Sequence, residues 1–178
     1  MNRVAEEIAM KPLAEVAGQE LIWTQPKFLK RAFQLLAGEE VVATLELAGA
    51  IRPKVVAATA EERWSFHREG VFSRSTRIES IESGAEVARF EENWRGGGTL
   101  TFQDGREYQW KSVSFWRGEY GFVGADLEPV VRLRTHGISI RNRAQLVIEP
   151  SARRIPGLGV LATLGWFLML RPRRRGAH

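Results

Sequence analysis

The sequence predicts an all-β protein with one central helix: a closed antiparallel β-barrel around an apolar α-helix near its C-terminus. Apolar and polar side chains alternate with a period of two along the middle of the chain, and turn signals separate the alternating segments at short intervals. The segment 155–170 contains no charged residue and is apolar on all sides. Such a helix must be buried, and a sheet that surrounds it completely would bury it.

The alternation is clearest in segments 41–47, 63–67 and 86–92. In 63–67, Trp64 and Phe66 lie on one face of the predicted strand, and charged or polar neighbours lie on the other. A sheet with one apolar and one polar face is typical of antiparallel strands. The frequent turns indicate a meander, folded as a sandwich or as a barrel, and no long helical pattern interrupts it.

Asp104-Gly105 marks the clearest hairpin, because the runs 99–103 and 106–110 on either side of it both alternate. This pair favours a two-residue type I′ turn, in which both residues have positive φ. The residues predicted to form the core, from the strands and from the C-terminal helix, are Trp64, Phe66, Phe90, Leu100, Phe102, Tyr108, Trp110, Leu161, Leu164, Trp166 and Leu168.

The run 155–170 has two interpretations. As a helix, its sixteen residues would span about 24 Å, whereas a bilayer core is about 30 Å thick and requires about 20 apolar residues. Pro156 is compatible with a first helical turn, and Arg171 with Pro172 ends the run. The short length favours a helix inside the barrel, while the arginines on both sides leave a C-terminal membrane anchor open.

An all-β meander of this length that ends in a wholly apolar helix resembles the tubby C-terminal-like superfamily, which includes the LURP-one-related proteins and the phospholipid scramblases. The resemblance rests on LIWTQP at 21–26, ERWSFHREG at 62–70, FEENWRGGG at 90–98 and LATLGWFLML at 161–170. It implies a barrel of about twelve strands over 21–170, closed around the helix at 155–170. An N-terminal extension (1–20), with a short helix expected before Pro12, precedes the barrel, and a basic tail (171–178) follows it.

The resemblance implies little about activity. Tubby proteins bind phosphoinositides through a basic surface pocket, and that pocket has no matching residues in this chain. Scramblases carry calcium-binding and palmitoylated segments, whereas this sequence has no cysteine to acylate and no Asp-rich loop for calcium. The absence of cysteine also excludes disulfides and thiolate metal sites.

The charge of the chain is concentrated near its C-terminus. The net charge is +5, yet residues 1–152 hold 20 basic and 21 acidic groups, and six arginines without any acidic residue follow from Arg153 onward. A nucleic-acid-binding domain usually spreads a basic face over its body, so no nucleic-acid partner is expected. Glu6 and Glu7 lie where a secretion signal needs apolar residues, which predicts a cytoplasmic protein.

Two basic groups are candidates for contact with an anion or an anionic lipid. They are Lys27, Lys30 and Arg31 after Pro26, and Arg171, Arg173, Arg174 and Arg175 in the tail. Near a negatively charged membrane, each tail arginine would contribute about 1 kcal/mol. The alternatives are a solvated loop for the first group and, for the second, favourable charge at the end of a helix.

No arrangement of residues predicts catalysis. His67, His136 and His178 lack a metal-ligand spacing, the serines lack a Gly-x-Ser-x-Gly elbow, and 96–98 lacks the Lys-Ser/Thr of a phosphate loop. The six tryptophans are read as core residues in preference to a ligand cage. The segment 115–117 together with Tyr120 is the least periodic group, so its aromatic residues are expected to be partly exposed.

The sequence therefore predicts a non-enzymatic binding or scaffold module without a cofactor or metal. The sequence leaves two alternatives for its partner: an anionic membrane surface, bound peripherally, or another protein. The alternative class is a membrane protein anchored by a transmembrane helix at 155–170.

Overall fold

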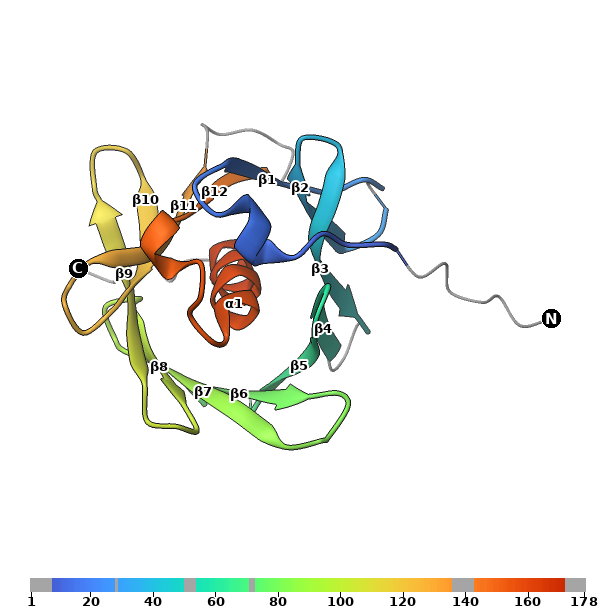
Figure 1. The fold of residues 1–178 in the computed structure, drawn as a ribbon. Coiled ribbons are helices and arrows are strands. Elements are labelled where there is room, and N and C mark those ends of the chain that lie inside the picture. The colour runs from blue at the N-terminus through green and yellow to red at the C-terminus, as the bar shows by residue number, and fades with distance from the viewer. Residues whose placement is uncertain (1–7, 28, 50–53, 71–72, 136–142, 172–178) are drawn as a thin grey trace.

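Twelve antiparallel strands form a closed barrel around a single helix, α1 (Leu158–Leu170), in the described part of the chain. The computed structural model describes residues 8–27, 29–49, 54–70, 73–135 and 143–171. Viewed along the barrel axis, α1 stands in the middle of the ring of strands (Figure 1). The predicted fold class is thereby confirmed.

Each strand pairs with its neighbours in sequence, and β1 closes the ring against β12. This order is an up-and-down meander, which removes both sheet edges by closure. The strands are β1 (Glu20–Thr24), β2 (Ala32–Ala37), β3 (Glu40–Ala48), β4 (Lys54–Thr59), β5 (Arg63–Arg68), β6 (Ser75–Ser80), β7 (Glu86–Glu92), β8 (Gly98–Phe102), β9 (Glu107–Ser114), β10 (Glu119–Val123), β11 (Pro129–Thr135) and β12 (Ala144–Ile148).

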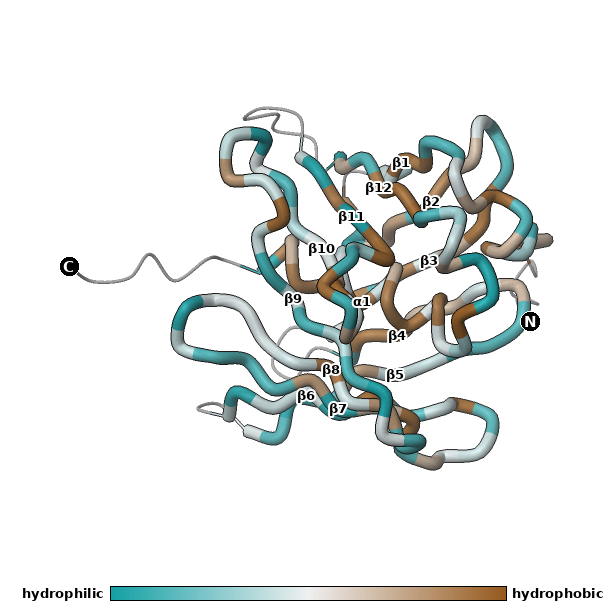
Figure 2. The backbone as a smooth tube through the Cα atoms, turned by 60° about the vertical axis from the view of Figure 1, so that its left-hand side comes forward, coloured by the Kyte–Doolittle hydropathy of each residue, from teal (hydrophilic) through white to brown (hydrophobic). Residues whose placement is uncertain are grey.

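The two-residue alternation directs one side chain in two toward α1. In β12, for example, Ala144, Leu146 and Ile148 are buried, and the residues between them are half-buried on the outer wall. Apolar stretches accordingly gather on α1 and the strands around it, while hydrophilic residues predominate in the turns (Figure 2). The predicted core residues are buried, except for Leu168, which is half-buried near the end of α1.

Helix α1 is apolar all round because the barrel surrounds it. Leu161 and Leu164 are fully buried, and the indole of Trp166 stacks on that of Trp23, with ring centroids 5.8 Å apart. The helix begins at Leu158 and not at Ile155. Gly157 has a left-handed backbone with φ +82°, so the chain turns there and the first helical turn cannot include Pro156.

The hairpin at Asp104-Gly105 is present, but its predicted turn type is wrong. Only Gly105 has positive φ (+89°), and the Gly105 amide donates to the Phe102 carbonyl. The strands close where the Phe102 amide donates to the Arg106 carbonyl, so the loop holds three residues. A three-residue loop with glycine in the left-handed position is the next most common hairpin connection.

The N-terminal segment covers one end of the barrel. The 3₁₀ helix η1 (Leu13–Val16) buries Leu13 and Val16 against the core, and the Gly18 amide donates to the carbonyl of Ile148. A second 3₁₀ helix, η2 (Pro150–Ala152), leads from β12 toward α1. The helix expected before Pro12 falls partly on residues 1–7, outside the described residues, and 8–12 form no helix.

Candidate functional site

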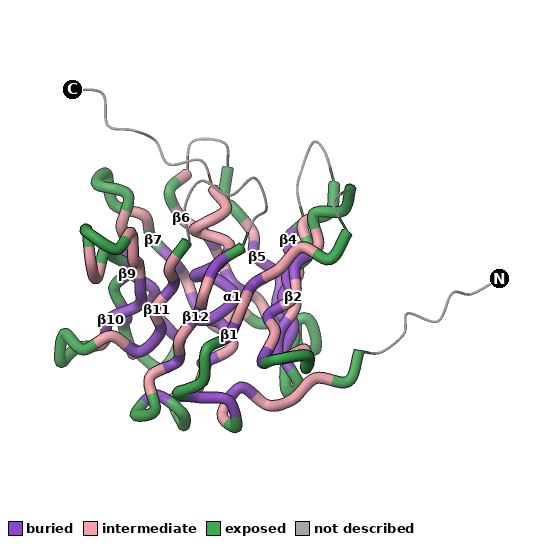
Figure 3. The backbone as a smooth tube through the Cα atoms, turned by 90° about the horizontal axis from the view of Figure 1, so that it is seen from above, coloured by how far each residue is buried: buried purple, intermediate pink, exposed green. Residues whose placement is uncertain are grey.

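The barrel has two chemically different ends. Because the strands are antiparallel, successive connections lie alternately at one end and at the other. Helix α1 identifies each end: Arg171, just after the helix, pairs with Glu92 at the end of β7 at 2.9 Å. Before the helix, the carbonyl of Pro156 accepts a 2.7 Å hydrogen bond from Arg106 in the β8–β9 turn. In Figure 3 the end where α1 finishes is at the top, and segment 8–19 crosses the bottom.

The end where α1 finishes is basic, and we call it the basic end. Its connections are described over 25–27, 29–31, 49, 69–70, 73–74, 93–97, 115–118 and 143. Glu69 is the one acidic residue in these described stretches. The seven cationic residues in them are Lys27, Lys30, Arg31, Arg74, Arg95, Arg117 and Arg143, and all are exposed.

The opposite end, which we call the acidic end, has the reverse balance. Its hairpin turns are 38–39, 60–62, 81–85, 103–106 and 124–128, and Arg106 is the one cation in them. The other described segments of this end, 8–19 and 149–157, add the cations Lys11, Arg153 and Arg154 and the carboxylates Glu15 and Glu149. The seven acidic residues of the hairpin turns are Glu39, Glu61, Glu62, Glu82, Asp104, Asp126 and Glu128. The near-neutral body of the protein is therefore strongly polarised along the barrel axis.

The seven cations of the basic end are not neutralised by ion pairs. Among the described residues, no carboxylate pairs with Lys27, Lys30, Arg31, Arg74, Arg95, Arg117 or Arg143. At the acidic end, by contrast, two turn carboxylates are held by arginines. The hydrogen bond from Arg63 lowers the pKa of Glu82, and that from Arg106 lowers the pKa of Asp104.

Large apolar side chains protrude from the loops of the basic end. Leu29 is 95% exposed, and Trp94 is 74% exposed. Phe115 and Trp116, adjacent in the β9–β10 connection, are 83% and 94% exposed. Exposure of the last two confirms the expectation from their lack of periodicity. The reading of all six tryptophans as core residues is wrong for Trp94, and it is also wrong for Trp116, where it conflicted with that expectation.

The last turn of α1 reaches the same end of the barrel. Phe167, Leu168, Met169 and Leu170 are half-buried, unlike the fully enclosed residues earlier in the helix. The ring of Phe167 packs against that of Phe66 with centroids 5.6 Å apart, and the guanidinium of Arg171 lies 5.9 Å from its centroid. The predicted core residue Leu168 thus lies where the helix meets the basic end.

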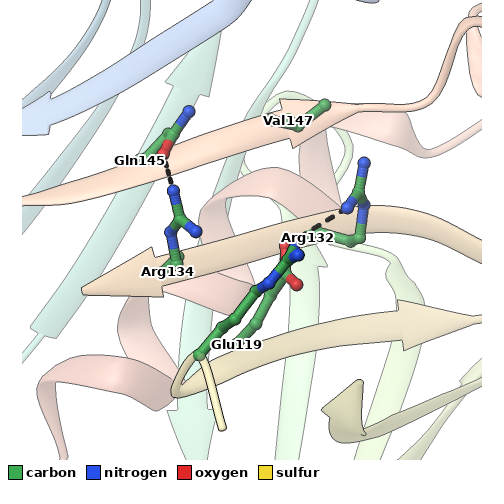
Figure 4. A pocket seen from close by; sticks show the side chains of 6 residues that line it. Glu119, Arg132, Arg134, Gln145 and Val147 are labelled. Carbon is green, nitrogen blue, oxygen red and sulfur yellow. Dashed lines mark hydrogen bonds and ion pairs between the residues drawn. The ribbon is translucent and has the colours of Figure 1, made fainter. Parts of the chain in front are cut away.

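A polar hollow of about 190 Å³ opens on the outer wall beside the basic end. Glu119 and Glu149 both pair with Arg132, at 3.3 and 2.6 Å, so the charge of this arginine is compensated. Arg134 instead donates to the neutral amide oxygen of Gln145 at 3.3 Å, and both side chains lie in view in Figure 4. Arg117 completes the lining from the β9–β10 connection. The hollow therefore offers two guanidinium groups without a carboxylate partner among the described residues.

The structure brings four of the seven predicted lipid-contact residues to one end. Lys27, Lys30 and Arg31 lie in the β1–β2 connection, and Arg171 lies at the same end. Arg171 is tied to Glu92, with its side chain 20% exposed, so it also fastens the helix to β7. Arg173, Arg174 and Arg175 lie outside the described residues. Sequence reasoning missed Arg74, Arg95, Arg117 and Arg143, which are far apart in the chain.

One cluster has the composition of a catalytic relay but not its geometry. Ser65 Oγ lies 2.8 Å from Nε2 of His67, and Glu79 Oε2 lies 3.3 Å from the same nitrogen. In a Ser-His-acid relay the nucleophile and the carboxylate bind different nitrogens of the imidazole. This cluster therefore cannot orient the ring as a relay does. No three His, Asp or Glu residues of the described part are grouped to hold a metal ion.

No helix within the described ranges is both long enough and apolar enough to cross a membrane. Helix α1 has 13 residues, and its first nine include the buried side chains that pack inside the barrel.

Compared with protein-family models, with curated proteins and with solved structures, the chain shows no significant match.

Proposed function

We propose that this protein is a non-enzymatic binding module of the tubby/LURP-one-like type that docks its basic end on an anionic membrane surface. The observation that carries the proposal is the separation of charge along the barrel axis. The connections of one end hold seven exposed cations and one carboxylate in their described stretches, and the turns of the other end hold the reverse.

The physical basis is the surface potential of an anionic membrane. A lysine or arginine close to such a surface contributes about 1 kcal/mol, within a Debye length of about 8 Å at physiological ionic strength. Several cations at one end can lie in that layer together, while the acidic end is repelled from it. Charge polarity therefore both binds the protein and orients it, with the end of α1 toward the lipid.

Two further features support the proposal. The barrel of twelve strands around an apolar helix is the architecture that the tubby/LURP-one resemblance implies. The hollow beside the basic end presents Arg117 and Arg134, whose forked N–H donors suit the oxygens of a phosphate group. These two side chains could donate hydrogen bonds to the phosphate of a lipid headgroup next to the docked end.

The proposal is tested by removing the same charge from each end of the barrel. The variant K27Q/K30Q loses two unpaired cations at the basic end. The matched control R153Q/R154Q loses two exposed cations after η2, at the acidic end, and neither pairs with a described carboxylate. Co-sedimentation is measured with vesicles that contain phosphatidylserine and with vesicles of phosphatidylcholine alone.

The wild-type protein is expected to sediment with the anionic vesicles only, and added salt should weaken this binding. K27Q/K30Q should bind about thirtyfold more weakly, since two cations contribute roughly 2 kcal/mol. The control should bind like the wild type. Equal losses in the two variants would mean that net charge alone acts, and the proposal would then be wrong, as it would be if the wild type did not bind.

A further inference from the structure

We infer that the basic end does more than touch the headgroups: its exposed apolar tips insert into the interfacial layer of the bilayer, and the barrel stands upright on the membrane. The inserting residues are Leu29, Trp94, Phe115 and Trp116. This inference rests on the proposed function, because insertion requires the basic end to reach the lipid first. Its evidence is independent, since it comes from apolar exposure and not from charge.

The exposure of these tips differs from ordinary surface scatter. Single exposed apolar side chains are common on soluble proteins and need no explanation. Here each of the four tips is at least 74% exposed, and all of them lie in connections of the same end. At the acidic end the most exposed counterpart is Leu127, at 69%, and the described residues of that end include no exposed aromatic side chain.

The tips are spread over several connections and do not form one patch. Leu29 follows β1, Trp94 follows β7, and the Phe115–Trp116 pair follows β9. In the ring the last two connections flank the β8–β9 hairpin, while β10, β11 and β12 separate β9 from β1. A protein partner would need a complementary surface for each separate tip, whereas fluid lipid closes around each one. The arrangement therefore favours a bilayer over a protein.

The side chains have the chemistry of the membrane interface. Tryptophan is enriched at the headgroup level, because its ring is apolar and its N–H is polar. The guanidinium of Arg95 lies 4.5 Å from the ring centroid of Trp94, so one tip combines an aromatic body with a cation for the phosphates. Phe115 and Trp116 pack edge to face with centroids 5.9 Å apart and protrude as a unit. Lysines and arginines between the tips can extend to the headgroups while their stems lie beside apolar surface.

The centre of the same end is suited to contact with lipid. Phe167, Leu168, Met169 and Leu170 at the end of α1 are half-buried there. With the tips inserted, the headgroup layer would lie close to these side chains. The helix axis would then point along the membrane normal, since α1 is seen end-on in the view along the barrel (Figure 1) and the contacts of Pro156 and Arg171 place its two ends at opposite ends of the barrel.

The first test compares apolar side chains at the two ends. F115S/W116S removes two tips whose side chains make no core contact, so the fold should be unaffected, with an unchanged melting temperature as the check. The control is L127N, since Leu127 has a left-handed backbone (φ +64°) that asparagine adopts readily. Binding to phosphatidylserine-containing vesicles should fall about tenfold or more in F115S/W116S, because this variant lacks two large apolar side chains that would move from water into the bilayer. L127N should bind like the wild type.

The second test measures insertion directly by fluorescence. Trp23, Trp64, Trp110 and Trp166 are buried, whereas Trp94 and Trp116 are exposed. Phosphatidylserine vesicles with bromine on the upper part of the acyl chains should therefore quench only the emission of the exposed pair. The variants W94F and W116F each retain one exposed indole and assign the quenching to its tip.

The results separate the two proposals. Quenching by brominated lipid together with weakened binding of F115S/W116S supports insertion. If the wild type binds anionic vesicles without quenching, and F115S/W116S binds equally well, insertion is wrong while electrostatic docking stands. If L127N loses as much binding as F115S/W116S, the orientation is wrong. If the wild type does not bind, both proposals fail.

Discussion

Two glycines in α1 set how closely the helix approaches the barrel wall. A Cβ on Gly159 would overlap the ring of Trp64 and lie 2.9 Å from the Thr59 methyl group. On Gly165 the nearest atom would be a terminal methyl of Leu133, also at 2.9 Å. The two positions differ because an indole ring enclosed in the core cannot move aside, whereas the end of a leucine side chain can.

Gly159→Ala is therefore expected to destabilise the protein more than Gly165→Ala. Overpacking against Trp64 costs about 1–3 kcal/mol, of which the better helix propensity of alanine recovers at most about 1 kcal/mol. At Gly165 the two effects should nearly cancel. Urea denaturation of both variants measures the difference, and a G159A variant at least as stable as the wild type would contradict the packing seen around Trp64.

At the scale of elements, α1 fills the interior that the ring of strands encloses. Inward residues of β3, β4, β10, β11 and β12 pack against it, so the barrel without the helix would enclose an unfilled space. Truncation of one buried leucine to alanine costs about 2–5 kcal/mol, and the whole stability of a domain is about 5–15 kcal/mol. Loss of the entire helix exceeds what the domain can tolerate.

A chain ending at residue 152 is accordingly expected not to fold, with no cooperative thermal transition and with aggregation during sedimentation. The matched control ends at residue 171, keeps the Arg171–Glu92 ion pair and removes only the tail, so it should melt like the full chain. Circular dichroism melts of the two truncations provide the comparison. A cooperative, monomeric 1–152 would mean that α1 is not the core of the barrel.

The elements show where sequence reasoning succeeds. Period-two alternation identified the strands within 41–47, 63–67, 86–92, 99–103 and 106–110, because a barrel wall with an apolar inside and a wet outside requires it. The uncharged run 155–170 identified the helix, because a helix that a sheet surrounds on all sides needs no polar face. The start of the helix and the type of the Asp104 turn were missed. The first depends on the positive φ of Gly157 and the second on whether Asp104 joins Gly105 in positive φ, and the residue types alone decide neither.

At the scale of the molecule, the basic end was not predicted, because the net charge of a long segment does not show how its charges are distributed in space. Residues 1–152 are nearly neutral in total, and this balance argued against a basic surface. In a meander, however, every second connection lies at the same end. Adding charges over alternate connections of the observed strands separates the seven cations from the seven carboxylates. The exposure of Trp94 follows similarly, because it lies in a connection just after β7.

Polarity along the axis also predicts the orientation of the bound protein. The sequence has no cysteine, so a single introduced cysteine can carry an environment-sensitive fluorophore without background labelling. Trp116→Cys places the label at the basic end, and Glu39→Cys places it in the β2–β3 turn of the acidic end. Both positions are exposed, and neither substitution removes a contact with the core.

On addition of phosphatidylserine vesicles, the label at 116 is expected to shift to shorter emission wavelength, because it enters a less polar layer. The label at 39 should not shift, because the acidic end is repelled from the surface and lies a barrel length away from it. Raising the ionic strength should reverse the shift at 116 by weakening the attraction of the cations. Equal shifts at both positions would mean that the protein binds on its side or without a fixed orientation, and the charge separation would then have no part in docking.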